Sequence, residues 1–139
     1  MKFRKYSDIK IGEKAELKRT ISEGDIEKFA KLSGDYNPIH LDEEFAQSTM
    51  FKGRIAHGIL TTSFISTVIA RDLPGPSSIY LGQNASFRKP VRIGDTLLVK
   101  VEVIQKIDEK EHIRLKTTCT NQNNELVLDG EALVMLMKM

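Results

Sequence analysis

The run HGILTTSFISTVIA, residues 57–70, has no acidic residue, lysine or arginine, and such charge returns only at Arg71. From Gly58 to about Leu73 the chain is long enough for a helix of about four turns. A helix that is apolar or small on every side is one that other structure surrounds. The run is also too short and too rich in hydroxyl groups to span a bilayer. We therefore expect a helix buried at the centre of the fold.

The second half of the chain has the character of strands. Leu97, Val99, Val101 and Val103 alternate with polar residues, and the same alternation places Cys119 on an apolar face as a small core residue. A buried helix followed by antiparallel strands predicts the α+β class, with a sheet curled around the helix. The expected strand segments are SIYLGQNASFRK, DTLLVKVEVIQKI, EHIRLKTTCT and LVLDGEALVMLMK. The turns between them are PVRIGD, DEKE and NQNNE.

The first half predicts shorter elements. KAELKRTI alternates as a half-buried strand would. Ser22 can cap a helix over SEGDIEKFAKLSG and Gly34 can end it, and a further short helix is expected near LDEEFAQS. The 139 residues contain no repeat or linker, so we expect one domain over residues 1–139.

Charge and cysteine content exclude several classes of protein. Lys and Arg number 21 against 19 Asp and Glu, a balance that argues against nucleic acid as a partner and does not suggest a membrane surface. The single cysteine rules out an internal disulfide and fits a reducing compartment. Basic residues at the N-terminus precede no apolar stretch, so no secretory signal is predicted. We expect a cytoplasmic protein.

The stretch SGDYNPIH, residues 33–40, combines an acid and a base. Because Pro38 disfavours helical geometry at Asn37, we expect a turned loop, which alone can bring Asp35 and His40 together. A carboxylate beside a neutral imidazole can hold a water, accept its proton and deliver a proton elsewhere. The alternative is a helix-capping Asp and a surface His in a polar loop.

Metal sites fit the sequence poorly. An EF-hand loop starting at Asp35 would need Gly and Glu where the chain has His40 and Ala46. A zinc site would need three or four ligands, yet no His-x-x-x-His and no cysteine pair occurs. We expect no metal.

Gly58 lies at the predicted start of the apolar helix. Backbone N–H groups there lack intrahelical acceptors, and together with the helix dipole they suit a developing oxyanion. The alternative is that Gly58 only permits a tight entry into the helix. We expect the neighbouring His57 to be structural.

Three motifs, SGDYNPIHLD, AHGIL and YLGQNASFRKPVRIGDTL, closely resemble those of the MaoC-like, (R)-specific enoyl-CoA hydratases, which have the hot-dog fold. The resemblance runs from about Ile21 to the C-terminus. It implies that Asp35 and His40 are the catalytic pair and that the backbone N–H of Gly58 lies in the oxyanion hole. Asn37 would shape the loop as active-site support.

The resemblance also implies roles for other residues. Ser66 looks like a serine found near the active site in some members, although a helical Ser bonded to its own backbone is the alternative. Arg88 and Lys89 could contact the phosphates of coenzyme A, or could simply be solvated. Members are usually homodimers, and a single unit has a sheet edge that needs covering.

The implied reaction is reversible syn hydration of a trans-2-enoyl-CoA to a (3R)-3-hydroxyacyl-CoA. No cofactor is needed, since coenzyme A is part of the substrate. As base, His40 must be neutral; a close carboxylate tends to raise its pKa, so we expect activity to fall on the acid side.

Other functions of the same fold remain open. An acyl-carrier-protein dehydratase would use the same residues. An acyl-CoA thioesterase commonly has a carboxylate on or near the central helix, yet no Asp or Glu lies between Glu44 and Asp72. The intact Asp35 and His40 speak against a binding subunit with a dead site.

Overall fold

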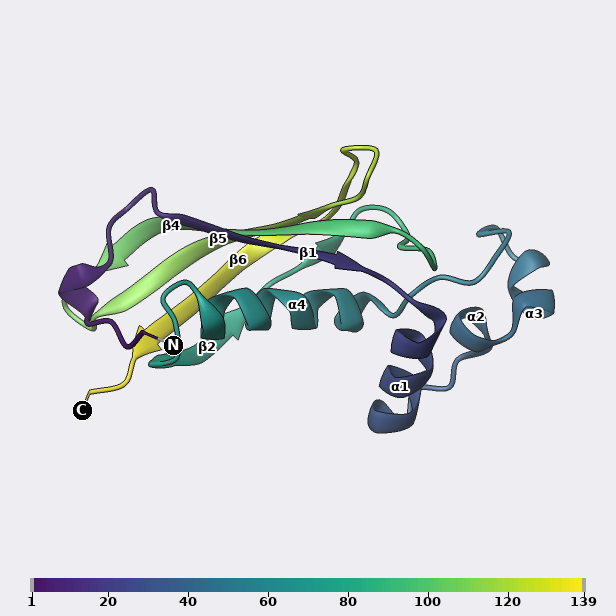
Figure 1. Ribbon diagram of the computed structural model, residues 1–139, viewed down its shortest axis with the longest axis horizontal. Coiled ribbons are helices and arrows are strands. Elements are labelled where there is room, and N and C mark those ends of the chain that lie inside the picture. The colour runs from purple at the N-terminus through teal and green to yellow at the C-terminus, as the bar shows by residue number, and fades with distance from the viewer. Residues whose placement is uncertain (1, 139) are drawn as a thin grey trace.

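The computed structural model describes residues 2–138 as an antiparallel sheet around one long helix. The strands run in the order β1-β4-β5-β6-β2, with β3 beside β6, and α4 lies along one face of the sheet (Figure 1). The strands are β1 (Lys14–Thr20), β2 (Ser78–Gln83), β3 (Ser86–Phe87), β4 (Thr96–Ile107), β5 (His112–Thr120) and β6 (Leu126–Leu136). The helices are η1 (Tyr6–Asp8), α1 (Glu23–Ser33), α2 (Pro38–Leu41), α3 (Glu43–Gln47) and α4 (Gly58–Arg71).

The core lies between α4 and the sheet, as the sequence predicts. Apolar side chains of α4 meet the inward face of the strands, and the alternation over residues 97–103 is confirmed, because all its apolar members are fully buried. Burial raises the pKa of the Cys119 thiol to about 12, so it is a core residue and no thiolate nucleophile. The core residues of α4 are Leu60, Phe64, Ile65, Val68 and Ile69.

One side of α4 differs from the expectation that structure surrounds the helix. Ile59 is 62% exposed, and Ser63, Thr67 and Ala70 on the following turns are exposed as well. These residues recur at helical spacing and form one continuous face. A single chain therefore leaves this apolar helix partly uncovered.

The segment SIYLGQNASFRK, expected as one strand, is broken between β2 and β3. A bulge interrupts the pairing of β2 with β6 between Tyr80 and Gly82. At the break, the carbonyl oxygen of Asn84 lies only 2.0 Å from where a Cβ on Gly130 would stand. Because Gly130 of β6 has no side chain, the backbone at Asn84 can pass directly over it. We call this close approach the crossing at Gly130, and it lies between the end of β2 and the start of β3.

Helices α1, α2 and α3 gather beyond the N-terminal end of α4 (Figure 1). Ser22 caps α1 by accepting from the Asp25 N–H, and Gly34 ends it with φ 81°, both as predicted. The expectation of a loop through His40 is partly wrong, because a four-residue helix begins at Pro38. Proline suits the first helical position, where no N–H is needed, and Asn37 caps that helix.

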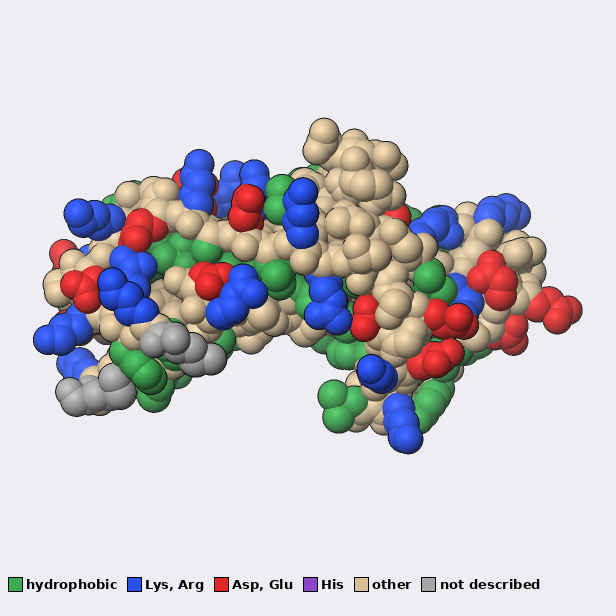
Figure 2. Space-filling view, viewed as in Figure 1, with side chains coloured by type: hydrophobic (Ala, Val, Ile, Leu, Met, Phe, Trp, Pro, Cys, Tyr) green, Lys and Arg blue, Asp and Glu red, His purple; other side chains and the backbone are tan. Residues whose placement is uncertain are grey.

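The two edges of the sheet differ in character. The β1 edge carries Lys14, Glu16, Lys18 and Arg19, and acidic and basic side chains lie along it in Figure 2. The β2 edge instead exposes Ile79, Tyr80 and Leu81. Charged residues on an edge strand disfavour its pairing with a strand of another chain, whereas exposed apolar residues favour such pairing. Within residues 2–138, no helix is both long and apolar enough to cross a membrane.

Candidate active site

Two local turns bring Asp35 and His40 together. The Asn37 N–H donates to Asp35 Oδ1, and Asn37 Oδ1 accepts from the Ile39 N–H, each over 3.2 Å. These turns bend the chain into α2, which carries His40 toward Asp35. Side-chain ligand atoms of Asp35, His40 and His57 all lie within 4.8 Å of one another. The proximity that the spacing suggested is therefore present.

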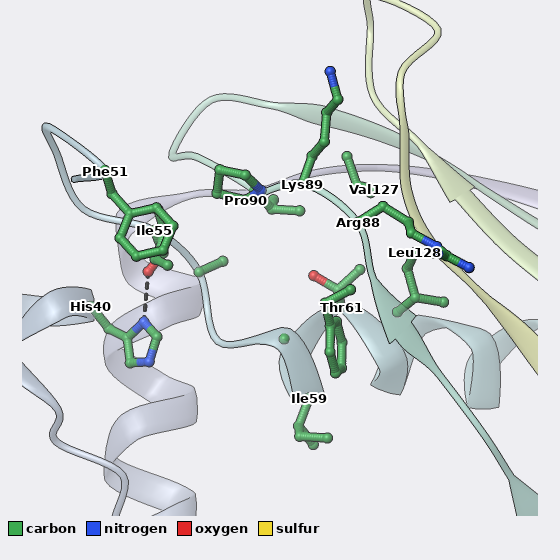
Figure 3. A pocket seen from close by; sticks show the side chains of 14 residues that line it. His40, Phe51, Ile55, Ile59, Thr61, Arg88, Lys89, Pro90, Val127 and Leu128 are labelled. Atoms are coloured by element: carbon green, nitrogen blue, oxygen red, sulfur yellow. Dashed lines mark hydrogen bonds between the residues drawn. The ribbon is translucent and has the colours of Figure 1, made fainter.

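A backbone carbonyl fixes the tautomer of His40. Its Nδ1 lies 2.8 Å from the carbonyl oxygen of Ile55 (Figure 3). A carbonyl can only accept, so Nδ1 carries the proton, and in the neutral ring Nε2 keeps its lone pair. Arg54, which sequence reasoning missed, donates from Nε to the His40 carbonyl over 2.7 Å and pairs with Glu23. The ring is thus held with a basic nitrogen free.

His57 lies against this pair. Its ring stacks on that of His40, with centroids 3.8 Å apart and planes 29° apart. Its Nε2 donates to the backbone carbonyl of Asp35 over 3.1 Å, and the residue is 2% exposed. The sequence predicted a structural His57 but gave no sign of these contacts, because neither its spacing nor its neighbours mark them.

The donor set does not suit a metal ion. Nδ1 of His40 and Nε2 of His57 are already engaged with carbonyl oxygens, so each ring offers one nitrogen. Nitrogen lone pairs lie in the ring planes, and stacked planes do not direct them to a common point at ligand distance. The cluster is better suited to proton transfer than to metal binding.

Burial lowers the pKa of His40 below its ordinary value. The neighbouring His57 also lowers it, whereas the Ile55 carbonyl and the Asp35 carboxylate raise it without reversing the shift. The carboxylate raises this pKa, as expected, but burial makes the net shift of the pKa downward. The free-energy cost of removing the protonated His40 ring from water is larger than the stabilisation that it gains from the exposed Asp35 carboxylate. The net downward shift of the pKa favours the neutral ring of His40.

His40 and the start of α4 line one pocket of about 400 Å³ (Figure 3). Gly58 is the first residue of α4, and His57 before it makes no side-chain cap hydrogen bond. Phe87, another residue that sequence reasoning missed, lies so close that a Cβ on Gly58 would stand 2.7 Å from its ring. The other apolar walls are Phe51, Ile55, Ala56, Ile59, Pro90, Val91, Val127 and Leu128.

Of the remaining predicted residues, two line this pocket and Ser66 does not. Ser66 is not in it but lines a neighbouring hollow of about 340 Å³ between α4 and β2. Arg88 and Lys89 do line the pocket, yet each is paired with an acid, Asp129 at 2.8 Å and Glu125 at 2.5 Å.

A family model for the MaoC-like domain matches residues 7–125. The chain belongs to the MaoC-like family. It is 50% identical to the (R)-specific enoyl-CoA hydratase of Rhodospirillum rubrum over 94% of this chain and 90% of that protein. Identity to the 3-hydroxybutyryl-CoA dehydratase of Methylorubrum extorquens is 49%, over 96% and 84% of the two chains.

A solved structure agrees with this membership. The unliganded R-hydratase PhaJ1 of Pseudomonas aeruginosa superposes with a TM-score of 0.90 and 46% identity, covering 97% of this chain and 86% of that one. The hot-dog fold that the resemblance implied for this MaoC-like chain is thereby confirmed.

Proposed function

We propose that this protein is an (R)-specific enoyl-CoA hydratase that adds water reversibly to trans-2-enoyl-CoA. The observation that carries the proposal is His40, whose proton is fixed on Nδ1 and whose basic Nε2 is free beside Asp35. His40 shares an apolar pocket with the uncapped start of α4. The names of the relatives, hydratase and dehydratase, describe the two directions of this one reaction.

The proposed reaction uses one water held between His40 and Asp35. Nε2 of His40 takes a proton from the water as its oxygen bonds to the β carbon of the enoyl group. The electron pair of the double bond moves toward the thioester carbonyl, whose oxygen gains negative charge near the Gly58 N–H. The pair then returns a proton to the α carbon from the same face, which gives the 3-hydroxyacyl product with no cofactor.

The substrate thioester fits the character of the pocket. Its apolar walls suit an acyl chain, and His40, Gly58 and Thr61 supply a few polar groups among them. We place the phosphates of coenzyme A near Arg88 and Lys89, which stand at the rim. Both already have acidic partners, so replacing either with Gln should raise KM for crotonyl-CoA only a few-fold, and an unchanged KM would remove them from the site.

We further propose that residues 1–139 form one hydratase domain that pairs with a second copy. The uncovered face of α4 and the apolar edge of β2 meet at the hollow lined by Ile59, Ser66 and Tyr80. We define the α4–β2 surface as Ile59, Ser63, Ile79, Tyr80 and Leu81. A second copy across this surface would cover both the helix and the open strand.

The test is the loss of enoyl absorbance when the protein meets crotonyl-CoA, with the configuration of the product assigned by chiral chromatography. The wild type should yield the R product. Asp35→Asn and His40→Ala should each lower kcat by a factor of about 100 to 10,000, the range of general acid–base catalysis. Ser7→Ala, a substitution in the η1 segment away from the pocket, is the matched control and should leave kcat unchanged.

Two results would contradict the proposal. Release of free coenzyme A would indicate a thioesterase. Full activity in His40→Ala would remove the base on which the mechanism depends. If crotonyl-CoA is untouched while the crotonyl ester of acyl carrier protein is hydrated, the chemistry stands and the carrier assignment is wrong.

A further inference from the structure

A buried hydroxyl on α4 has no hydrogen-bond partner. Thr61 is 2% exposed, and its Oγ1 contacts no donor or acceptor among the described residues. A buried hydroxyl without a partner costs free energy, so such a group in a folded protein needs an explanation. Among residues 2–138, the other buried side-chain atom without a partner is Nδ1 of His57, four residues earlier.

Neighbouring hydroxyls on the same helix show that a partner is within reach. Thr62 Oγ1 donates to the Gly58 carbonyl over 3.2 Å, and Ser63 Oγ donates to the Leu60 carbonyl over 2.6 Å. This bond to the preceding turn is the ordinary choice for a helical Ser or Thr. Thr61 does not make it. Its side chain instead lines the pocket that holds His40, and Figure 3 shows the hydroxyl oxygen directed into the cavity.

Among the described side chains that line the pocket, only His40 offers an acceptor, its Nε2, and the Thr61 hydroxyl makes no bond to it. Most of the others are apolar, and Arg88 and Lys89 have only donor groups on their side chains. Thr61 follows Gly58 by three positions, so the two lie on one face of α4. A helical side chain leans toward the N-terminus, which brings the hydroxyl toward the free N–H groups of the first turn.

We propose that the Thr61 hydroxyl donates a hydrogen bond to the thioester carbonyl oxygen, as a second donor beside the Gly58 N–H. This inference rests on the proposed hydratase function and deepens it. No group among the described residues accepts from this hydroxyl, and the proposed bond gives it an acceptor when substrate enters. Because the carbonyl oxygen becomes more negative as water adds to the β carbon, the bond is strongest in the transition state. Thr61 is thereby a catalytic residue.

Substitution by valine separates this role from a structural one. Thr61→Val keeps the shape and removes the hydroxyl. It should lower kcat for crotonyl-CoA about 100-fold, as loss of one oxyanion donor does, with KM little changed. The midpoint of thermal unfolding should stay the same or rise, because an unpaired buried hydroxyl is replaced by a methyl group. Thr61→Ser should keep most of the activity.

Thr117→Val is the matched control. Thr117 is fully buried on β5, and its hydroxyl oxygen accepts from Gln83 Nε2 over 3.0 Å. Its loss should lower the unfolding midpoint and leave kcat unchanged, the reverse of the Thr61 result. Unchanged kcat in Thr61→Val overturns the inference while the proposed function stands. A rise in KM alone also overturns it, since that places the hydroxyl on the pantetheine arm. An inert wild type overturns the function and the inference together.

Discussion

At the scale of single residues, the central feature is that burial lowers the pKa of His40 and so favours its neutral ring, although the hydrogen bond to the Ile55 carbonyl opposes this shift. The Ile55 carbonyl holds the proton on Nδ1, and burial disfavours a second proton. The adjacent carboxylate of Asp35 works against this shift but does not reverse it. A base that stays unprotonated at neutral pH needs no activation step before it takes the proton of water.

The pH dependence of activity follows from this shift. Because the pKa of His40 is lowered from 6.5, kcat/KM should be level at neutral pH and fall only below pH 6.5. The measurement is initial rate against pH with crotonyl-CoA at concentrations well below KM. An acid limb centred at or above pH 6.5 would show that the carboxylate outweighs burial.

Folding stability should depend on the same group. The unfolded chain protonates His40 near its ordinary pKa of 6.5, and the folded chain only at lower pH. Between these values the unfolded state binds more protons, so the stabilising contribution is complete above pH 6.5 and declines as pH falls through the folded pKa. Urea unfolding of wild type and His40→Asn between pH 8 and pH 5 measures this. The wild type should lose stability relative to the variant on acidification; parallel curves would contradict the prediction.

At the scale of elements, the long periodic segments could be predicted and the local breaks could not. The central helix, the alternation of β4 and the caps of α1 follow from spacing and side-chain type. The break between β2 and β3 does not, because it depends on Gly130, which lies more than forty residues along the chain from Asn84. The α2 helix is similar: Asn37 before Pro38 is non-helical, as predicted, yet Pro38 itself begins a short helix, because the first helical position needs no N–H.

The site shows the same division. Asp35, His40 and Gly58 are marked by local motifs. The contacts of Arg54, His57 and Phe87 arise only when distant segments meet, so no spacing rule reveals them.

The crossing at Gly130 gives a prediction for the sheet. Gly130→Ala would place a methyl group 2.0 Å from the Asn84 carbonyl oxygen, so the backbone of one strand must shift. We expect a loss of about 1–3 kcal/mol in the free energy of unfolding, as for other overpacked sites. Gly24→Ala on α1 is the control, since its nearest new contact is an ordinary 3.7 Å. Urea unfolding compares the two variants; equal stability would show that the crossing can relax.

At the scale of the whole molecule, the two sheet edges predict how copies associate. Leu81 is 42% exposed on the apolar β2 edge, within the α4–β2 surface. Leu81→Lys should shift the protein from two chains to one in light scattering, because a buried lysine without a partner is costly. Ile11→Lys, near the charged β1 edge, should remain a dimer. A wild type that scatters as one chain at working concentration would contradict this prediction.

The construction of the pocket has a consequence for how such a protein can diversify. The proposed acid–base pair and the helix start belong to one stretch, residues 35–61, whereas the facing wall comes from residues 87–91, at the end of β3 and in the loop after it, and from residues 127–128 of β6. Phe51, Ile55, Ala56 and Ile59 of the first stretch also line the pocket, but the wall opposite the proposed reacting groups is carried by separate parts of the sequence. Mutation can enlarge or narrow the chamber at Phe87 or Val127 while the reacting groups keep their places, so acyl preference can drift among descendants that all perform one reaction.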